Sequence, residues 1–119
     1  MNEHEKINYV EIPAKDMLAT KTFFSEVFGW SFVDYGPEYS AFSNAGLDGG
    51  FYQSDLTVST ENGSVLIVFY SKDLKQTQTK IEAAAGSVIK PIFSFPGGRR
   101  FHFTDPNGNE YAVWSDLPK

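Results

Sequence analysis

The chain contains two segments that repeat the same order of structural signals, and this repeat constrains its fold more than any other feature. Asp16 and Asp73 stand at positions typical of helix N-caps, and Gly29 and Gly86 stand where the helices that follow them should end. Both pairs are separated by 57 positions, so the two copies align without a gap. Aspartate and glycine are common cap residues, which leaves chance agreement as the alternative, but the matching order of elements favours a duplicated unit.

Short β-rich runs, separated by turns that contain Gly and Pro, surround the two predicted helices. We expect the first strand to end at Pro13, because proline has no N–H to donate to a β-ladder. The runs give each copy the order β-α-β-β-β, so the predicted fold class is α+β. A single domain over residues 1–119 then holds repeat units at about 6–54 and 64–116. The predicted strands are residues 7–12, 30–35, 39–44, 49–53, 65–70, 88–93, 100–104 and 110–115.

The composition supports a small folded domain and excludes several classes of function. With 119 residues, 41% of them hydrophobic and 16% aromatic, the chain has enough apolar surface for one core. A net charge of −5 argues against nucleic-acid binding, which needs clustered Lys and Arg. The absence of cysteine excludes disulfides, thiolate zinc sites and a Cys nucleophile. No apolar run suggests a leader or a membrane span, so we expect a soluble cytoplasmic protein.

Two glycine pairs, Gly49-Gly50 and Gly97-Gly98, are similar to the glycine-rich loops that cradle phosphate groups. Neither pair is followed directly by a helix whose N-terminus would hold an anion. We therefore interpret both pairs as glycines of turns or β-bulges.

Two stretches resemble a known family. They are YVEIPAKDMLATKTFFSEVFGW, with a strand, an N-cap Asp, a Phe-Phe pair and a terminal Phe-Gly, and FHFTDPNGNEYAVW, with an Asp-Pro-x-Gly-Asn hairpin. Both resemble the glyoxalase/bleomycin-resistance/dioxygenase superfamily, also called vicinal oxygen chelate proteins. The resemblance implies that two βαβββ units curl a mixed sheet into a half-barrel cup with the helices on its outer face. It also implies a homodimer and a small-molecule ligand inside the cup.

The positions that hold the family's metal ion carry unsuitable residues here. The resemblance places one ligand on the first strand and one on the fourth strand of each unit, which corresponds to Tyr9, Gln53, Leu66 and Ala112. Only Gln53 offers an ordinary ligand oxygen, and the whole chain has two histidines. We therefore expect no metal and no other cofactor, and leave open whether Gln53 or Glu11 contributes to an atypical site.

Strand alternation predicts which side chains line the cup. Glu11, Arg100 and His102 are its candidate polar groups, in a mainly aromatic and apolar lining that suits a small planar or anionic molecule. Alternatively, Glu11 and Arg100 form a structural ion pair, His102 satisfies its hydrogen bonds structurally, and the aromatic residues belong to the core or an interface. The predicted ligand-binding residues are Tyr9, Glu11, Tyr52, Leu66, Val68, Arg100, His102 and Trp114.

Three hypotheses for function follow. The first is a metal-free protein that binds a small aromatic or anionic molecule, as the family's resistance members do. The second is a metal-independent lyase or isomerase, with Glu11 or His102 as general base and Arg100 stabilising an enolate-like charge. The third is a dimeric interaction module with a closed cup. A perturbed base in an open cavity favours the enzyme, and an absent cavity favours the module.

Overall fold

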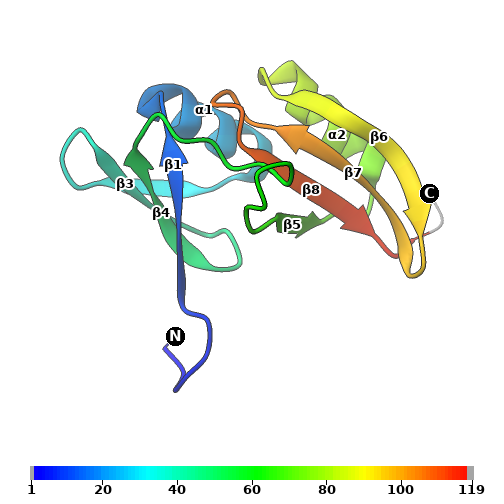
Figure 1. Cartoon of the computed structure of the whole chain (residues 1–119), viewed down its shortest axis with the longest axis horizontal. Coiled ribbons are helices and arrows are strands. Elements are labelled where there is room, and N and C mark those ends of the chain that lie inside the picture. Colours follow the sequence, from blue (N-terminus) through cyan, green and yellow to red (C-terminus); the bar gives the residue numbers. More distant parts are fainter. Residues whose placement is uncertain (1, 118–119) are drawn as a thin grey trace. The chain divides into compact units, whose positions relative to one another are not determined.

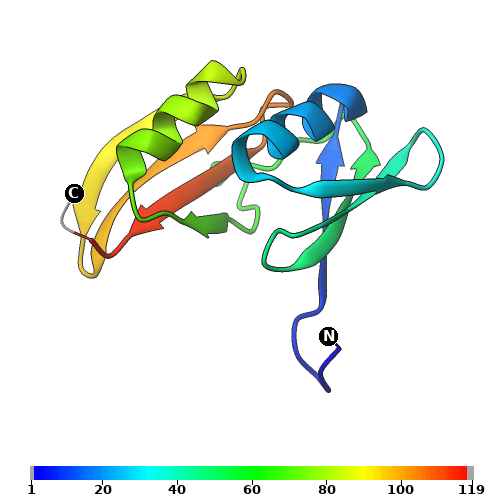
Figure 2. The ribbon, with the colours of Figure 1, turned by 180° about the vertical axis from the view of Figure 1, so that it is seen from behind.

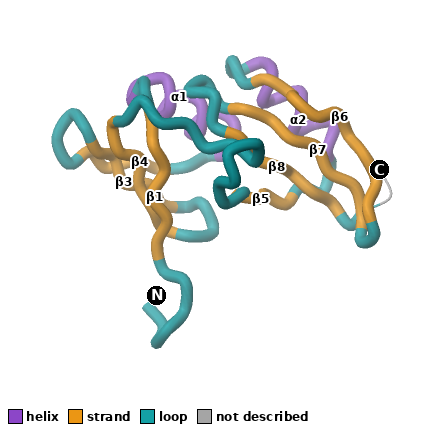
Figure 3. Tube along the Cα trace, in the orientation of Figure 1, coloured by secondary structure: helices purple, strands orange, loops and turns teal. Residues whose placement is uncertain are grey.

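The computed structural model describes residues 2–117, and the chain divides after Leu56 into two compact units, called unit 1 and unit 2 (Figure 1). Each unit contains one helix and one four-stranded sheet. Figure 3 distinguishes helices, strands and loops by colour. Within residues 2–117, neither helix has the length and apolar character needed to span a bilayer.

Unit 1 has the predicted order of elements. Its elements are β1 (Tyr9–Ala14), α1 (Met17–Phe28), β2 (Ser31–Asp34), β3 (Tyr39–Ser43) and β4 (Asp48–Gln53). The strands lie in the order β1-β4-β3-β2, with β1 parallel to β4 and the other pairs antiparallel. The expected end of the first strand was wrong, because β1 continues through Pro13 to Ala14. Proline is tolerated there since β1 is an edge strand that pairs only with β4.

Unit 2 repeats this arrangement, so the predicted α+β class with two βαβββ units is confirmed. Its elements are β5 (Ile67–Tyr70), α2 (Leu74–Ala83), β6 (Ser87–Phe95), β7 (Gly98–Thr104) and β8 (Glu110–Ser115). The strand order is β5-β8-β7-β6, and β5 runs parallel to β8. Seen from behind in Figure 2, each helix lies across the sheet of its own unit.

The core of each unit lies between its helix and one face of its sheet. In unit 1 the ring of Trp30 stacks on Phe24 at 4.4 Å and on Phe42 at 4.3 Å between centroids. In unit 2 the rings of Phe103 and Tyr111 stack at 5.2 Å. Burial of each such side chain contributes about 1.5–3 kcal/mol. The alternate residues of the same strands therefore lie on the opposite face, called the open face below.

The glycine pair in unit 1 is not a turn or bulge, which corrects the interpretation from the sequence. Gly49 and Gly50 lie within β4, paired to both β1 and β3. A Cβ on Gly49 would come within 2.5 Å of the Phe42 ring, and one on Gly50 would come within 2.4 Å of the Tyr39 ring. Both residues are therefore glycine because an aromatic ring of β3 lies over each. In the second pair, Gly97 lies in a turn as predicted, whereas Gly98 begins β7.

The helix caps agree with the predicted repeat at one end only. Asp16 and Asp73 accept hydrogen bonds from the amides of Ala19 and Gln76, as N-caps do. The left-handed residue after α1 is Gly29, with φ of 72°. After α2 it is Ala85, with φ of 75°, and not Gly86. The Gly86 amide donates instead to Ile81 O, which places the left-handed position one residue earlier than in the first copy.

Replacing Ala85 by glycine should stabilise the protein. An L-residue in the left-handed conformation costs about 1–2 kcal/mol, and glycine removes this cost. Part of the gain is lost because glycine also has more conformational freedom in the unfolded chain. We expect Ala85→Gly to raise the free energy of unfolding by about 0.5–1 kcal/mol in urea denaturation. The matched change Gly29→Ala should lower it by about 1 kcal/mol, since a Cβ there meets no atom within 4 Å and only the backbone is strained. Equal effects of the two substitutions would contradict this assignment of the caps.

Candidate functional site on the open sheet faces

Tyr9, Glu11 and Tyr39 form a hydrogen-bonded group, the tyrosine cluster, on the open face of unit 1. Tyr39 reaches from β3 across Gly50 to β1, where its hydroxyl donates to Glu11 Oε2 at 3.0 Å. The Tyr9 and Tyr39 hydroxyl oxygens are 2.5 Å apart. Because the Tyr39 proton is directed to Glu11, Tyr9 is the donor in that second bond. The chain of bonds therefore ends on the Glu11 carboxylate.

The tyrosine cluster holds its central phenol in the neutral form. Burial raises the pKa of the Tyr39 phenol, and its hydrogen bonds with Tyr9 and Glu11 raise it further, to well above its ordinary range. Glu11, predicted as a possible base, is thus already a hydrogen-bond acceptor.

Two neighbouring predicted residues lie on β4: Tyr52 is half-buried, and Gln53 is exposed with its amide donating to Lys15 O at 2.7 Å.

His102 and Glu110 form a buried pair on the open face of unit 2. His102 Nδ1 lies 2.7 Å from Glu110 Oε2, and the two side chains are 3% and 8% exposed. Glu110 also accepts from the amide of Thr60 at 2.8 Å and from its hydroxyl at 3.0 Å. Three donors on one carboxylate hold its position and that of the imidazole.

These bonds determine which ring nitrogen of His102 carries the proton. Burial alone would raise the pKa of the Glu110 carboxyl, but the hydrogen bonds from Thr60 and His102 outweigh it and lower that pKa. Glu110 is therefore an anion at neutral pH and requires a donor at Nδ1. In the neutral imidazole the lone pair is then on Nε2. That atom is buried and has no hydrogen-bond partner in the described chain.

Arg100 lies next to this pair with aromatic contacts. Its guanidinium carbon is 5.5 Å from the centroid of Phe93 and 5.7 Å from that of Phe95, within the range of cation–π attraction. The register of β6 against β7 shifts on both sides of Lys90, which itself pairs with His102. Such irregularities in an edge strand often bend the strand and redirect its side chains.

The structure brings together part of the predicted set. Arg100, His102 and Trp114 share the open face of unit 2, and Val68 lies opposite Ala112 on the neighbouring strand. Leu66 is outside β5, which begins one residue later. Glu11 and Arg100 belong to different units, so their ion pair stays a prediction. Two surface cavities, of about 930 Å³ in unit 2 and about 510 Å³ in unit 1, are lined by other residues.

Sequence reasoning missed Tyr39, Thr60 and Glu110. Alternation alone places Glu110 on the same face as Ala112 and Trp114, so this residue was within reach of the sequence. Tyr39 is recognised only once β3 is aligned so that its ring lies over Gly50. Thr60 belongs to a loop and carries no such signal.

The four family metal positions do not fit a metal ion. Leu66 and Ala112 have no ligand atom in their side chains, the Tyr9 hydroxyl is bonded to Tyr39, and Gln53 offers a single amide oxygen, because its amide nitrogen donates to Lys15 O. Within residues 2–117 no three His, Asp or Glu side chains are grouped closely enough to hold a metal. The chemistry available on these faces is therefore that of their own side chains.

The buried Glu110 anion should make the protein sensitive to acid. A carboxyl whose pKa is lowered in the folded state adds stability above its unfolded pKa, and this contribution disappears as the pH falls through the lowered value. We expect unfolding free energy to fall below about pH 4.5, and to fall less steeply in Glu110→Gln, when measured in urea at several pH values. The control Asp116→Asn, whose carboxylate accepts from the exposed phenol of Tyr70, should keep the wild-type slope. Equal slopes for wild type and Glu110→Gln would contradict the prediction.

Comparison with known proteins agrees with this fold. A fosfomycin resistance protein, FosX, from Listeria monocytogenes is 17% identical and superposes with a TM-score of 0.78, covering 97% of this chain and 96% of that one. A lactoylglutathione lyase from Agrobacterium tumefaciens is 20% identical, with a TM-score of 0.70 and 95% of each chain covered. A glyoxalase-related enzyme from Fulvimarina pelagi is 17% identical, with a TM-score of 0.77, 93% of this chain and 88% of that one.

A search of curated proteins gives no significant match. The family model of the Glyoxalase/Bleomycin resistance protein/Dioxygenase superfamily matches residues 6–113, nearly the whole chain. This confirms the resemblance noted in the two sequence stretches, and the protein belongs to the Glyoxalase/Bleomycin resistance protein/Dioxygenase superfamily.

Proposed function

We propose that this protein binds a small organic molecule, aromatic or anionic, on the open face of unit 2, without a metal ion at the family positions. The observation that carries the proposal is the Nε2 atom of His102, which is buried and without a hydrogen-bond partner in the described chain. Glu110 holds the other ring nitrogen, so Nε2 is presented as a fixed acceptor. A ligand O–H or N–H group would satisfy it.

Other side chains on the same face suit such a ligand. Arg100 offers positive charge for an anionic group, and its aromatic neighbours offer faces for stacking. Val68 is 43% exposed and Trp114 is half-buried, which leaves apolar surface for a ring. Tyr9, Glu11 and Tyr52 of unit 1, and Leu66 of unit 2, remain in the proposed ligand-binding set as predictions from the sequence.

The relatives are consistent with a small-molecule ligand. One structural neighbour is a fosfomycin resistance protein and another is a lactoylglutathione lyase. The printed names of both relatives refer to small organic molecules, fosfomycin in the first and lactoylglutathione in the second. A homodimer and a cytoplasmic location are part of the same proposal, by analogy with the family.

A metal-independent lyase or isomerase is the second candidate. His102 is the base favoured for it, because an imidazole oriented by a carboxylate is a recurring arrangement of general bases. Glu11 is less suitable, since it already accepts the Tyr39 proton. In such a reaction Arg100 would stabilise an enolate-like anion. An interaction module is the third hypothesis, and it requires no ligand at His102.

Binding of three related probes tests the proposal. The protein is purified untagged with EDTA, examined by native mass spectrometry for retained molecules, and titrated with 4-hydroxybenzoate, benzoate and phenol by calorimetry. We expect 4-hydroxybenzoate to bind most tightly, because it combines a donor for His102 with an anion for Arg100. His102→Gln should weaken its binding about tenfold, equal to one lost hydrogen bond of ~1.4 kcal/mol, and should affect benzoate little. Gln retains an N–H donor for Glu110.

The control is His4→Gln, which removes the chain's other histidine, an exposed residue. It should bind all three probes as wild type does. Binding that appears only after adding Zn²⁺ or Mn²⁺ would overturn the metal-free proposal. Absence of any retained molecule and of binding to every probe would favour the interaction module instead. Conversion of a bound compound over time would favour the enzyme.

A further inference from the structure

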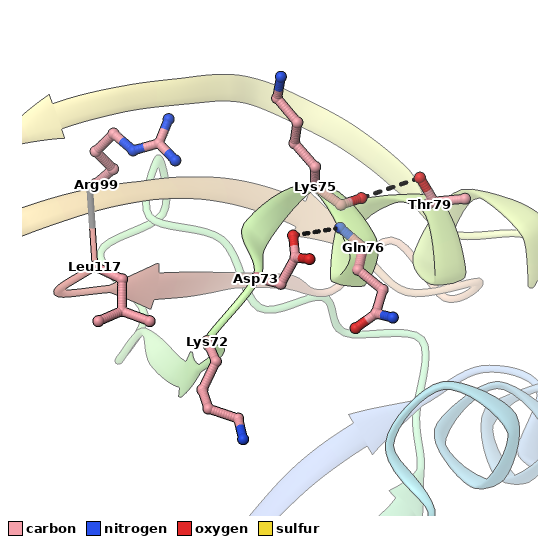
Figure 4. A pocket seen from close by; sticks show the side chains of 7 residues that line it. All are labelled: Lys72, Asp73, Lys75, Gln76, Thr79, Arg99 and Leu117. Atoms are coloured by element: carbon pink, nitrogen blue, oxygen red, sulfur yellow. Dashed lines mark hydrogen bonds between the residues drawn. The ribbon is translucent and has the colours of Figure 1, made fainter. Parts of the chain in front are cut away.

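A second surface of unit 2 has the features of an anion site, on the side of the sheet away from His102. The cavity of about 930 Å³ lies beside the start of α2 (Figure 4). Arg99 enters it from β7. Since Arg99 and Arg100 are adjacent in a strand, Arg99 lies on the face of Phe101, which the helix covers. The lining residues are Lys72, Asp73, Lys75, Gln76, Thr79, Arg99 and Leu117.

The guanidinium of Arg99 lacks acceptors within the described chain. Its Nε and Nη2 atoms are shielded from solvent and have no hydrogen-bond partner. These two nitrogens form one edge of the guanidinium, with two parallel N–H bonds. That edge matches two oxygens of a phosphate or carboxylate group. A partly desolvated cation without a counter-charge is costly, so the geometry favours an anion at this edge.

The charges around Arg99 favour an anion with more than one negative charge. Lys72 and Lys75 extend in opposite directions from the start of α2, and the Arg99 guanidinium is directed toward the helix (Figure 4). Both lysines are exposed, so their ammonium groups are free to reorient toward a ligand. Asp73 is the one acidic residue among the described lining residues, and its Oδ1 atom is the N-cap acceptor for Gln76 N at 3.1 Å.

We propose that this cavity binds the phosphate group of a small phosphorylated molecule. Phosphate carries about −1.5 to −2 charges at neutral pH, whereas a carboxylate carries one. The three cationic side chains therefore match the charge of a phosphate group better than that of a carboxylate. The cavity is much larger than one phosphate ion, so the remainder of the molecule is accommodated along α2. This site is independent of the function proposed for the open face, and a ligand at one does not require a ligand at the other.

Titration with inorganic phosphate tests the site in the full-length protein. Amide shifts of the N-terminal half of α2 and thermal stability are followed against phosphate, acetate and chloride at matched ionic strength. We expect saturable shifts with phosphate, weaker ones with acetate and none with chloride. Arg99→Gln should weaken phosphate binding at least about tenfold, and Arg99→Lys by about half as much on a logarithmic scale, because lysine keeps the charge but loses the paired donors.

Lys80→Gln is the matched control, since it removes one positive charge from the opposite end of the same helix. It should leave phosphate binding unchanged. If Arg99→Gln fails to fold, the double variant Lys72→Gln/Lys75→Gln replaces it and should weaken binding about tenfold. Equal binding of phosphate and acetate would overturn the phosphate assignment. Phosphate binding that survives loss of Arg99, or is equally lost in Lys80→Gln, would overturn the site.

Discussion

The parallel pairing of the first strand with the last strand of each unit is the constraint on which the rest depends. In unit 1 it places Glu11 opposite Gly50, and in unit 2 it places Val68 opposite Ala112. The helix between the first two strands must then cover one face of the sheet, where the aromatic core forms. The other face is left to alternate residues. Tyr9, Glu11 and Val68 lie on the strands of this pairing, and the antiparallel strands that join β4 and β8 add Tyr39, Arg100 and His102 to the same faces.

On both open faces a carboxylate organises the polar groups. Glu11 accepts from Tyr39, and Glu110 accepts from Thr60 and His102. The consequences differ because of burial. The tyrosine cluster is partly open to water, which can complete its hydrogen bonds. The side chain of His102 is 3% exposed, and its second ring nitrogen has no hydrogen-bond partner within the described chain. The open face of unit 2 therefore has the stronger chemical reason to hold a ligand.

The sequence predicted the elements well because their signals are local. An aspartate cap depends on its own helix, and strand alternation identified the face of His102 without knowledge of its neighbours. The failures involve registers or partners. Pro13 continues β1 because that strand is at the sheet edge, and Gly50 is required by the ring of Tyr39 on another strand. The partner of His102 was within reach by alternation, but the contribution of Thr60 comes from a loop that no periodic pattern describes.

Glu110 fixes the orientation of His102, and this leaves the acceptor of the imidazole on Nε2. The most direct measurement is the tautomer of His102 by long-range ¹H–¹⁵N correlation NMR at about pH 8. We expect a proton on Nδ1 and an unprotonated Nε2 in the wild type, and loss of that preference in Glu110→Gln, whose amide can donate to Nδ1. A proton on Nε2 in the wild type, or the same tautomer in both proteins, would contradict it.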